Sequence, residues 1–382
     1  MNPQLSAIPA SLIRAIHAKK QPGDIDLGLG EPLLRPDLAP FERATAWVQR
    51  HGCPYTPNAG ALDLREAIAA SCAYPGLDQP ENVCVTVGSQ EALYLAIKVL
   101  CDPACHEVLI VAPCYPAYAK LCALEGIAHR FVVMDSAEDY APDPARVLAA
   151  LSPNTRLIVL ATPANPTGRV WSAAALLALA EGLSQRGGER PYVLIDEVYR
   201  ALCYVEPRPP SLASLYDRTL VANSLSKSHA LTGLRLGWLL APKPITEAVV
   251  KAHQFLLTSA STYSQRVAHA VLTESPGIEA ALAHYLAQRQ AIRAALSHHR
   301  LRHIAPEGAF YTLVALPPDF ARTSLDAALA LLESQRVVTI PGSAFEAEGW
   351  LRLSWVAPVA DLQAGAARIA AFFDHPDVQT PT

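Results

Sequence analysis

Seven short apolar runs, separated by longer amphipathic stretches, constrain the fold of this 382-residue chain more than any other feature. Continuous apolar runs of strand length are typical of strands buried on both faces, and intervening helical patterns are typical of parallel crossover connections. The pattern predicts an α/β fold with a mostly parallel, seven-stranded sheet and helices on both faces. The predicted strands are 83–87, 108–111, 131–134, 157–160, 193–195, 220–222 and 236–240.

A different pattern follows after residue 276. Apolar residues at helical spacing predict a long helix over 277–299 that leads out of the sheet domain. The following strand candidates and helical pattern predict a second, smaller α+β domain; they are 310–316, 337–340 and 351–355, with a helix over 325–335. We assign residues 1–44 to an N-terminal arm that is part of the small domain, 45–280 to the large domain, and 281–382 to the small C-terminal domain.

Composition and charge exclude several classes of protein. The net charge of −4 and the lack of any Lys/Arg run longer than two argue against nucleic acid as a partner. No apolar run approaches the ~18 residues that span a bilayer, and basic residues interrupt the first 24 positions, so we expect a cytoplasmic protein without a membrane partner. The eight cysteines lack CxxC spacing, and His298, His299 and His303 have no acidic or cysteine neighbour, so we expect no metal site.

Lys227 follows two alternate hydroxyl groups in the segment Ser224-Leu225-Ser226-Lys227, and Arg235 comes eight residues later in a glycine-flanked turn. This arrangement offers an amine beside a cluster of hydrogen-bond donors of the size that a phosphate group needs. It suits a lysine joined as an imine to pyridoxal phosphate. The segment alone leaves open an ordinary surface lysine near a loop.

Two more polar groups follow predicted strands, at the edge where open α/β sheets bind their ligands. Ser89 and Gln90 follow the first run and open a helix, whose free amides and dipole favour a phosphate. A simple helix cap by Ser89 explains the same residue. Asp196 ends the run 193–195, and a carboxylate there can keep a pyridine nitrogen protonated, which makes the ring an electron sink.

The same cofactor accounts for three further side chains near the predicted strand ends. Tyr199, after Asp196, and Asn165, in the turn Asn165-Pro166-Thr167-Gly168, can donate hydrogen bonds to the phenolic oxygen of the pyridine ring. Tyr115 offers a flat face on which that ring can stack.

Taken together, these motifs resemble those of the fold-type I, class I/II pyridoxal-phosphate-dependent aminotransferases. Asn-Pro-x-Gly, Asp-x-x-Tyr, Ser-x-Ser-Lys and Gly-x-Arg-x-Gly occur in the order typical of that family, and the likeness extends from residue 27 to residue 354. The resemblance implies that the region 45–280 is the cofactor-binding domain. It also implies that Lys227 forms the imine, Asp196 pairs with the pyridinium, Tyr199 and Asn165 contact the phenolic oxygen, and Ser89, Gln90, Ser224, Ser226 and Arg235 hold the phosphate.

The resemblance further implies a homodimer with shared active sites. Tyr55, in the segment 55–60, matches the tyrosine that reaches the phosphate in the neighbouring subunit. Arg352 matches the arginine that holds the substrate α-carboxylate through two parallel hydrogen bonds. Gly30 matches the glycine whose backbone closes over the substrate, and Asn165 contributes to the same substrate site.

The expected reaction moves an amino group from an L-amino acid to a 2-oxo acid with ping-pong kinetics. A branch of aspartate-using members carries a lysine where this chain has Gln90, so we expect a neutral, aromatic or aliphatic substrate. Arg35 is a weaker candidate for binding a distal carboxylate. The main alternative is a carbon–sulfur β-lyase, or another enzyme that forms a Cα carbanion on the same fold, because such enzymes share the cofactor residues.

Three other classes fit the sequence poorly. A dinucleotide oxidoreductase needs a third glycine after Gly28-Leu29-Gly30, inside the first βα unit. A serine hydrolase of the common α/β type needs a Gly-x-Ser-x-Gly segment, which the chain lacks. A transcription regulator built on this fold needs an added DNA-binding domain, for which the first ~30 residues are too short.

Overall fold

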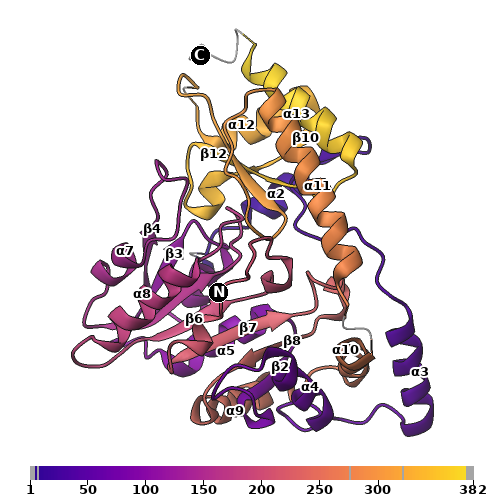
Figure 1. Cartoon of the computed structure of the whole chain (residues 1–382), viewed down its shortest axis with the longest axis vertical. Helices are drawn as coiled ribbons and strands as arrows, with labels where there is room; N and C mark the ends of the chain where they lie inside the picture. The colour runs from indigo at the N-terminus through magenta and orange to yellow at the C-terminus, as the bar shows by residue number, and fades with distance from the viewer. Residues whose placement is uncertain (1–4, 7, 275–276, 321, 376–382) are drawn as a thin grey trace.

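The main sheet has seven strands in the order β2-β8-β7-β6-β5-β3-β4 (Figure 1). The computed structural model describes residues 5–6, 8–274, 277–320 and 322–375. The seven predicted strands are all present, with ends that differ by a few residues from the apolar runs. They are β2 (Val83–Thr86), β3 (Glu107–Ala112), β4 (Ala128–Val133), β5 (Thr155–Ala161), β6 (Tyr192–Asp196), β7 (Thr219–Ser224) and β8 (Gly237–Leu240).

Strand direction brings several loops to one edge of this sheet. Strands β3, β4, β5, β6 and β7 pair in parallel, whereas β8 is antiparallel to both β7 and β2. Because β2 therefore runs in the same direction as β7, the carboxyl ends of β2, β5, β6 and β7 lie at the same edge. The chain reverses between β7 and β8 over residues 225–236, and this connection carries Lys227 and Arg235 at that edge.

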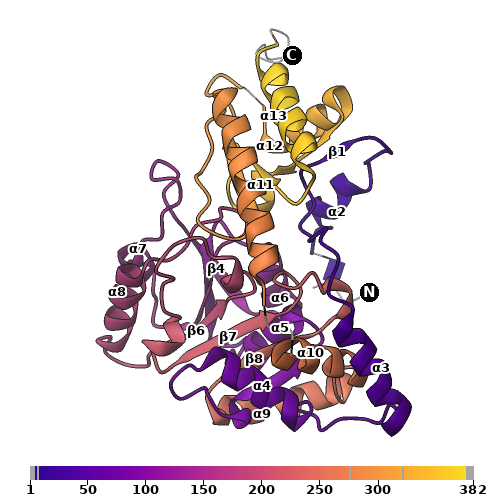
Figure 2. The same ribbon diagram turned by 45° about the vertical axis from the view of Figure 1, so that its right-hand side comes forward.

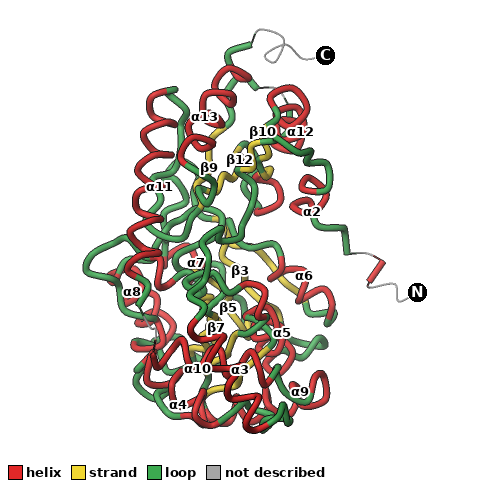
Figure 3. Tube along the Cα trace, turned by 90° about the vertical axis from the view of Figure 1, so that its right-hand side faces the viewer, coloured by secondary structure: helices red, strands yellow, loops and turns green. Residues whose placement is uncertain are grey.

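Helices cover both faces of the sheet, as expected (Figures 1 and 3). Successive side chains of a strand point to opposite faces, so alternate strand residues belong to two separate apolar clusters. One face packs against α5 (Ser89–Leu100), α6 (Ala117–Leu124) and α9 (Lys243–Leu257). The other packs against α3 (Ala39–His51), α4 (Leu62–Cys72), α7 (Pro144–Ala149), α8 (Ala173–Ser184) and α10 (Thr262–Glu274). This layering is the α/β fold expected from the apolar runs.

A smaller α+β layer lies beyond the carboxyl edge, with its own apolar cluster. Its antiparallel sheet has the order β11-β12-β9, with β9 at Tyr311–Ala315, β11 at Ile340–Pro341 and β12 at Trp350–Ser354. The long α11 (Glu279–His298) runs from the large layer to the small one (Figure 2). The small layer also contains α12 (Ser324–Ala330), followed by a π-helical turn at Leu331–Gln335, and α13 (Val359–Phe373).

The N-terminal segment contributes to this smaller layer. Strand β1 (Ile25–Asp26) pairs in parallel with β10 (Val337–Val338), and Ile16 of α2 (Leu12–His17) is buried in the same apolar cluster. The domain boundaries at 44/45 and 280/281 stay predictions. Within the described ranges, no helix is long and apolar enough to cross a membrane, and no group of three or more His, Cys, Asp or Glu side chains is arranged to hold a metal.

Candidate active site

The carboxyl edge of the sheet brings Lys227 beside the N-terminal segment. The Lys227 Nζ atom donates a hydrogen bond of 2.6 Å to the backbone oxygen of Gly30. Burial lowers the pKa of Lys227 to about 8; Glu31 opposes that change, while Arg352 and Arg235 reinforce it. An amine with such a pKa exchanges its proton readily near neutral pH, unlike an exposed lysine.

Asp196 ends β6 and is buried at the same edge. Its Oδ2 atom accepts a hydrogen bond of 2.8 Å from the Tyr118 hydroxyl, and its Oδ1 atom accepts one of 3.2 Å from the Val198 amide. Burial raises its pKa to about 6, although both hydrogen bonds oppose the change. None of the ion pairs among the described residues includes Asp196. The carboxylate therefore forms no ion pair within the described chain, and the more distant charge of Lys227 only partly opposes the rise of its pKa.

A turn suited to an anion lies between β2 and α5. Gly88, before the first residue of the helix, has a φ of 78°, which a side chain disfavours. The Arg235 guanidinium covers this turn, since a Cβ added to Gly88 would lie 2.8 Å from its Nη2 atom. A Cβ at Gly237 would clash with the Ser89 amide nitrogen. Glycine at position 237 therefore lets the Arg235 connection approach the amino end of α5.

The two predicted serines complete this cluster. Ser224, the last residue of β7, and Ser226 are both buried, and the Ser224 Oγ atom accepts a hydrogen bond of 3.3 Å from the Ser226 amide. Gln90 connects the turn to Tyr115, whose hydroxyl donates a hydrogen bond of 3.2 Å to the Gln90 Oε1 atom. Ser224 lies opposite Gly237 in the pairing of β7 with β8, and so near the Ser89 amide, while Gln90 brings Tyr115 to the same turn.

Arg352 joins three segments that are far apart in the sequence. It lies on β12 and is almost fully buried. Its Nη1 atom donates a hydrogen bond of 3.1 Å to the Asn165 Oδ1 atom, and its Nη2 atom donates one of 2.6 Å to the backbone oxygen of Gly28. Its guanidinium carbon lies 4.4 Å from the centre of the Tyr311 ring and 4.8 Å from that of Phe345. The predicted substrate residues Asn165, Arg352 and the Gly30 segment therefore meet at one place.

Tyr199 is buried beneath the small layer and contacts a residue that the sequence did not single out. The hydroxyl oxygens of Tyr199 and Tyr311 lie 2.9 Å apart, and either one can be the donor. Burial raises the pKa of Tyr199, and that of Tyr311, above the ordinary value for a phenol. Both hydroxyls are therefore protonated at neutral pH.

Tyr55 does not join these residues within the chain. It lies on the outer surface with 85% of its area exposed, beside other exposed apolar residues at the end of α9. Asn58 connects the two segments through a hydrogen bond of 2.8 Å from its Nδ2 atom to the backbone oxygen of Thr258. Arg35 is also exposed and takes part in no ion pair found among the described residues.

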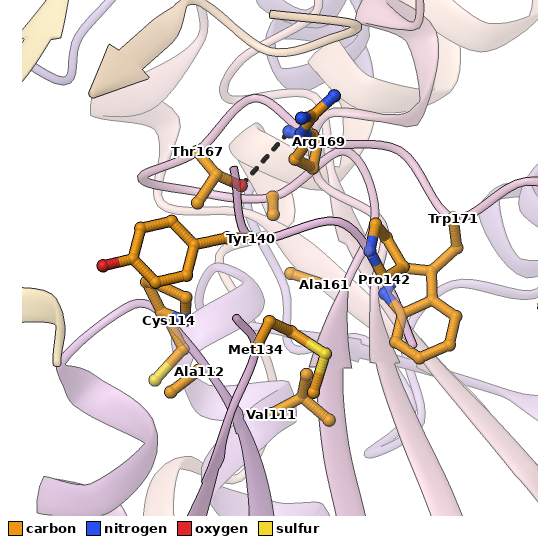
Figure 4. Close-up of a pocket in the computed structure, with 12 residues that line it drawn as sticks. Val111, Ala112, Cys114, Met134, Tyr140, Pro142, Ala161, Thr167, Arg169 and Trp171 are labelled. Carbon is orange, nitrogen blue, oxygen red and sulfur yellow. Dashed lines mark hydrogen bonds between the residues drawn. The ribbon is translucent and has the colours of Figure 1, made fainter. Parts of the chain in front are cut away.

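A small cavity is bounded in part by Ala164, Thr167 and Arg169, which belong to the segment around Asn165 (Figure 4). It has a volume of about 30 Å³ and is bounded by Met134, Tyr140, Thr167 and Trp171 among others. Its size is enough for one or two water molecules but not for an amino acid. The cavity is therefore too small to be the substrate site.

Sequence reasoning missed two residues with direct contacts at this site. Tyr118 binds Asp196, and its only sequence signal is its position one helical turn after Tyr115. Tyr311 contacts Tyr199 and Arg352, but in the sequence it is simply the first polar position of an apolar strand. Neither contact follows from local patterning, because each depends on how two distant segments pack.

The chemistry of this donor set fits pyridoxal phosphate. The buried Asp196 lacks a cation that a protonated pyridine nitrogen would supply, and the Gly88 turn presents helix amides and Arg235 to an anion. Lys227 provides an amine of lowered pKa between these two regions. Each residue type matches a different part of the cofactor.

Comparison with known proteins identifies the family. The model of the family "Aminotransferase class I and II" matches residues 24–369. The chain is 33% identical to a probable N-acetyl-LL-diaminopimelate aminotransferase of Bacillus subtilis, over 97% of this chain and 95% of that protein. It is 32% identical to a probable aspartate/prephenate aminotransferase of Thermus aquaticus, over 96% of each chain.

Solved structures give the same result. The aspartate aminotransferase of Thermus thermophilus with maleate has a TM-score of 0.90 and 30% identity, and the match covers 97% of this chain and 99% of that one. The expected fold type, cofactor and reaction class are thus confirmed. This chain belongs to the class I and II aminotransferases, and it is a pyridoxal-phosphate-dependent enzyme of that family.

Proposed function

We propose that this enzyme transfers the amino group of a neutral L-amino acid to a 2-oxo acid, with Lys227 as the residue that attaches the cofactor and moves the substrate proton. The observation that carries this proposal is the half-buried Lys227 amine, which lies at the same edge of the main sheet as Asp196 and donates to the Gly30 backbone, two residues after the Gly28 oxygen that Arg352 contacts. When bound, pyridoxal phosphate supplies an electron sink that stabilises negative charge at the substrate Cα atom.

The residues that would hold the cofactor divide into three groups. Asp196 would bind the pyridine nitrogen, and Asn165 and Tyr199 would bind the phenolic oxygen. Tyr115 would cover a face of the ring. The phosphate would be held by Ser89, Gln90, Ser224, Ser226 and Arg235 of one chain and by Tyr55 of a second chain.

Lys227 is suited to act as a general base and acid. Its lowered pKa, about 8, means that a substantial fraction of the amine is neutral in mildly alkaline solution. When it is released from the cofactor, its Nζ atom removes the Cα proton of the substrate and holds it for return. The hydrogen bond to the backbone oxygen of Gly30 keeps the amine oriented in the meantime.

Arg352 orients the amino acid for this proton transfer. Its guanidinium is held between the rings of Tyr311 and Phe345, so its two terminal nitrogens face Asn165 and the Gly28 segment in a fixed plane. A planar guanidinium binds a carboxylate through two parallel hydrogen bonds. Binding of the substrate α-carboxylate requires Arg352 to exchange at least one of its present partners.

The preference for a neutral side chain is supported by the uncharged Gln90 at the phosphate turn and by the exposed position of Arg35. The names of the relatives point to acidic as well as other substrates, because one is called an aspartate/prephenate aminotransferase. Another structure with 27% identity and a TM-score of 0.85 is called an aromatic aminotransferase of Pyrococcus horikoshii. The family therefore spans both classes, and the side chain has to be tested directly.

We also propose a homodimer in which Tyr55 completes the site of the partner. The exposed Tyr55 and the neighbouring apolar residues at the end of α9 support it. Tyr55→Ala chains should keep about a tenth of the wild-type activity and Lys227→Ala chains almost none, and mixing the two in equal amounts should raise the activity to about a quarter of wild type. Half of randomly paired dimers are hybrids, and each hybrid has one intact site. Unrestored activity after verified subunit exchange would contradict shared sites.

Product analysis tests the reaction and the substrate together. The holoenzyme is incubated with phenylalanine, methionine, alanine, aspartate or cystathionine, with and without 2-oxoglutarate or pyruvate. We expect a 2-oxo acid only when the acceptor is present, and faster turnover of a neutral amino acid than of aspartate. Acceptor-independent release of pyruvate, ammonia and thiol from cystathionine would favour the carbon–sulfur lyase, and faster turnover of aspartate would contradict the neutral substrate.

A further inference from the structure

Tyr311 lies at the centre of the candidate site, where its ring packs against Arg352 and its hydroxyl approaches Tyr199. It is the first residue of β9 and is buried. Its ring lies under the Arg352 guanidinium at 4.4 Å and meets the Tyr199 ring edge-on, with centres 5.6 Å apart. Its hydroxyl also approaches the N-terminal segment, because a Cβ added to Gly30 would lie 2.6 Å from it. One side chain thus contacts three residues of the proposed site.

The hydroxyl groups of Tyr199 and Tyr311 carry two protons, but the single hydrogen bond between them involves only one. Each hydroxyl has one proton, and burial raises both pKa values, so neither proton is lost at neutral pH. A contact of 2.9 Å between two oxygens accommodates one of them. The structure gives neither hydroxyl a second hydrogen-bond partner among the described residues. The remaining proton therefore needs an acceptor that the described chain does not provide.

We propose that the Tyr311 hydroxyl donates to the Tyr199 oxygen, which directs the proton of Tyr199 toward the phenolic oxygen of the bound cofactor. Tyr311 is then a positioning residue, which acts through Tyr199. This inference rests on the proposed roles of Tyr199 and Lys227. In the opposite orientation Tyr199 would donate its only proton to Tyr311 and could offer the cofactor only an oxygen lone pair, which cannot stabilise negative charge on a phenolic oxygen.

The consequence is a measurable change in the proton affinity of the cofactor linkage. A donor at the phenolic oxygen stabilises negative charge there and so weakens the hold on the proton at the linkage to Lys227. A hydrogen bond received by Tyr199 polarises its own O–H group and strengthens this donation, because hydrogen bonds in a chain reinforce one another. Loss of the Tyr311 hydroxyl should therefore raise the pH at which the bound cofactor loses that proton.

The test uses Tyr311→Phe, Tyr199→Phe and the double variant, each as purified holoenzyme. Phenylalanine at position 311 keeps the ring under Arg352 and removes only the hydroxyl. The visible absorbance of the bound cofactor is followed against pH. We expect a large upward shift of the midpoint in Tyr199→Phe and an upward shift of roughly half a pH unit in Tyr311→Phe. The double variant should match Tyr199→Phe, because Tyr311 acts only through Tyr199.

Tyr204→Phe is a matched control for the loss of a tyrosine hydroxyl near β9. The Tyr204 hydroxyl donates a hydrogen bond of 2.5 Å to the backbone oxygen of Ala309, two residues before Tyr311, and none of the hydrogen bonds found among the described residues joins it to Tyr199. This variant should lose thermal stability without any change of the midpoint. The KM for the amino acid should change little in Tyr311→Phe, since Arg352 keeps its aromatic neighbour.

Three outcomes would overturn the inference, and they are distinguishable. An unchanged midpoint in Tyr311→Phe would show that its hydroxyl does not act through Tyr199. A double variant whose shift equals the sum of the two single-variant shifts would show that the two hydroxyls act separately. A wild-type protein whose absorbance does not respond to pyridoxal phosphate, or shows no borohydride-fixed pyridoxyl group on Lys227, would remove the proposed function and this inference with it.

Discussion

The carboxyl edge of the main sheet and the outer surface around Tyr55 both lack partners in the single chain, but they lack opposite kinds of partner. At the edge, the charged groups of Asp196 and Lys227 are largely removed from water, and burial shifts both pKa values toward the neutral forms. On the outer surface, Tyr55 and Phe255 expose 85% and 80% of their areas. In a folded protein, buried charged groups and large exposed apolar groups are both uncommon, so each one calls for an explanation.

The difference teaches what kind of molecule completes each region. A buried charge is costly unless it is matched by an opposite charge or hydrogen bonds, so the edge is suited to a small polar ligand. Exposed apolar side chains that lie together gain free energy when another apolar surface covers them, so the outer surface is suited to a protein. The first region fits the cofactor and substrate, and the second fits another copy of the chain. The following variants test that division.

Lys227→Ala should have the largest effect. Without the amine, the protein cannot attach the cofactor covalently or move the Cα proton, so kcat should fall by about 10⁴-fold or more. Borohydride treatment should then leave no pyridoxyl group on the chain, as judged by peptide mass analysis. Lys243→Ala, an exposed lysine at the start of α9, is the matched control and should retain full activity. Substantial turnover by Lys227→Ala would contradict the assignment.

Asp196→Asn should lower activity by about a thousandfold, because an amide cannot keep the pyridine nitrogen protonated. The expected loss of transition-state stabilisation is about 4 kcal/mol. Asparagine keeps one oxygen to accept the hydrogen bond from the Val198 amide, and its Nδ2 group can donate to the Tyr118 hydroxyl oxygen, so the fold should be intact. Single-turnover kinetics with a neutral amino acid measure the effect. Activity within tenfold of wild type would mean that another group holds the pyridine nitrogen.

Asp196→Asn should lower the activity of the holoenzyme but raise the stability of the apoprotein. Burial raises the folded-state pKa of Asp196 to about 6 from an ordinary value of 3.8. Protonation of Asp196 stabilises the folded protein, and this contribution is fully present below the ordinary pKa of 3.8. It is lost as the pH rises through about 6, where the buried carboxyl group becomes ionised. Apo Asp196→Asn should therefore be more stable than apo wild type by about 3 kcal/mol at about pH 8, and the gain should be smaller at about pH 4.

Urea unfolding of both apoproteins at the two pH values measures this difference. Saturation with pyridoxal phosphate should reduce the advantage of Asp196→Asn, because the cofactor supplies the missing positive partner to the wild-type carboxylate. An apo variant that is less stable than wild type at both pH values would show that the Asp196 carboxylate is already compensated within the chain. The carboxyl edge of the sheet would then not need a small polar ligand to balance the charge of Asp196.

The sequence predicted most of the first region and little of the second. The motif residues Asp196, Asn165 and Lys227 follow buried strands, and parallel pairing brings such positions to one edge without any further information. The direction of β8 and the contact between Tyr199 and Tyr311 depend on packing between layers that are distant in the sequence. No local pattern encodes such contacts.

The outer surface is harder to predict for a related reason. Phe255, Leu256 and Leu257 form a continuous apolar end of α9, which by pattern alone reads as part of a buried core. The structure shows instead that they are exposed, next to the segment of Tyr55. The likeness of Tyr55 to a tyrosine of the family predicted a role for one residue but not the extent of the surface around it.

Leu256→Asp tests whether that surface pairs two chains. An added carboxylate within a covered apolar interface should dissociate the dimer and lower activity by about tenfold, because each site would lose its neighbouring Tyr55. Leu177→Asp on α8 is a matched control, since Leu177 and Leu256 both expose 47% of their areas. Sedimentation velocity at several concentrations measures the oligomeric state. An unchanged dissociation constant of the dimer in Leu256→Asp, or monomers in both variants, would contradict an interface at this position.

Arg14→Ala should have the smallest effect, and it tests the boundary of the first region. Burial is the main cause that raises the pKa of Tyr115, and the charge of Arg14 opposes it, so this exposed residue of α2 acts on the site although the sequence did not single it out. Arg35 is not among the main causes of the pKa shifts of Tyr115, Lys227 and Asp196, and it is the matched control.

Aspartate carries a side-chain carboxylate that Arg14 can attract across solvent, whereas phenylalanine does not. An exposed charge pair contributes about 0–1 kcal/mol, so Arg14→Ala should lower kcat/KM for aspartate by about threefold and change that for phenylalanine less than twofold. Arg35→Ala should change neither value. The steady-state kinetics of both variants with both substrates measure the effect, and high salt should reduce it because exposed charges are screened. A loss of a hundredfold for aspartate in Arg14→Ala would mean that this arginine binds a distal carboxylate in a desolvated pocket, and the neutral substrate would then be the wrong assignment.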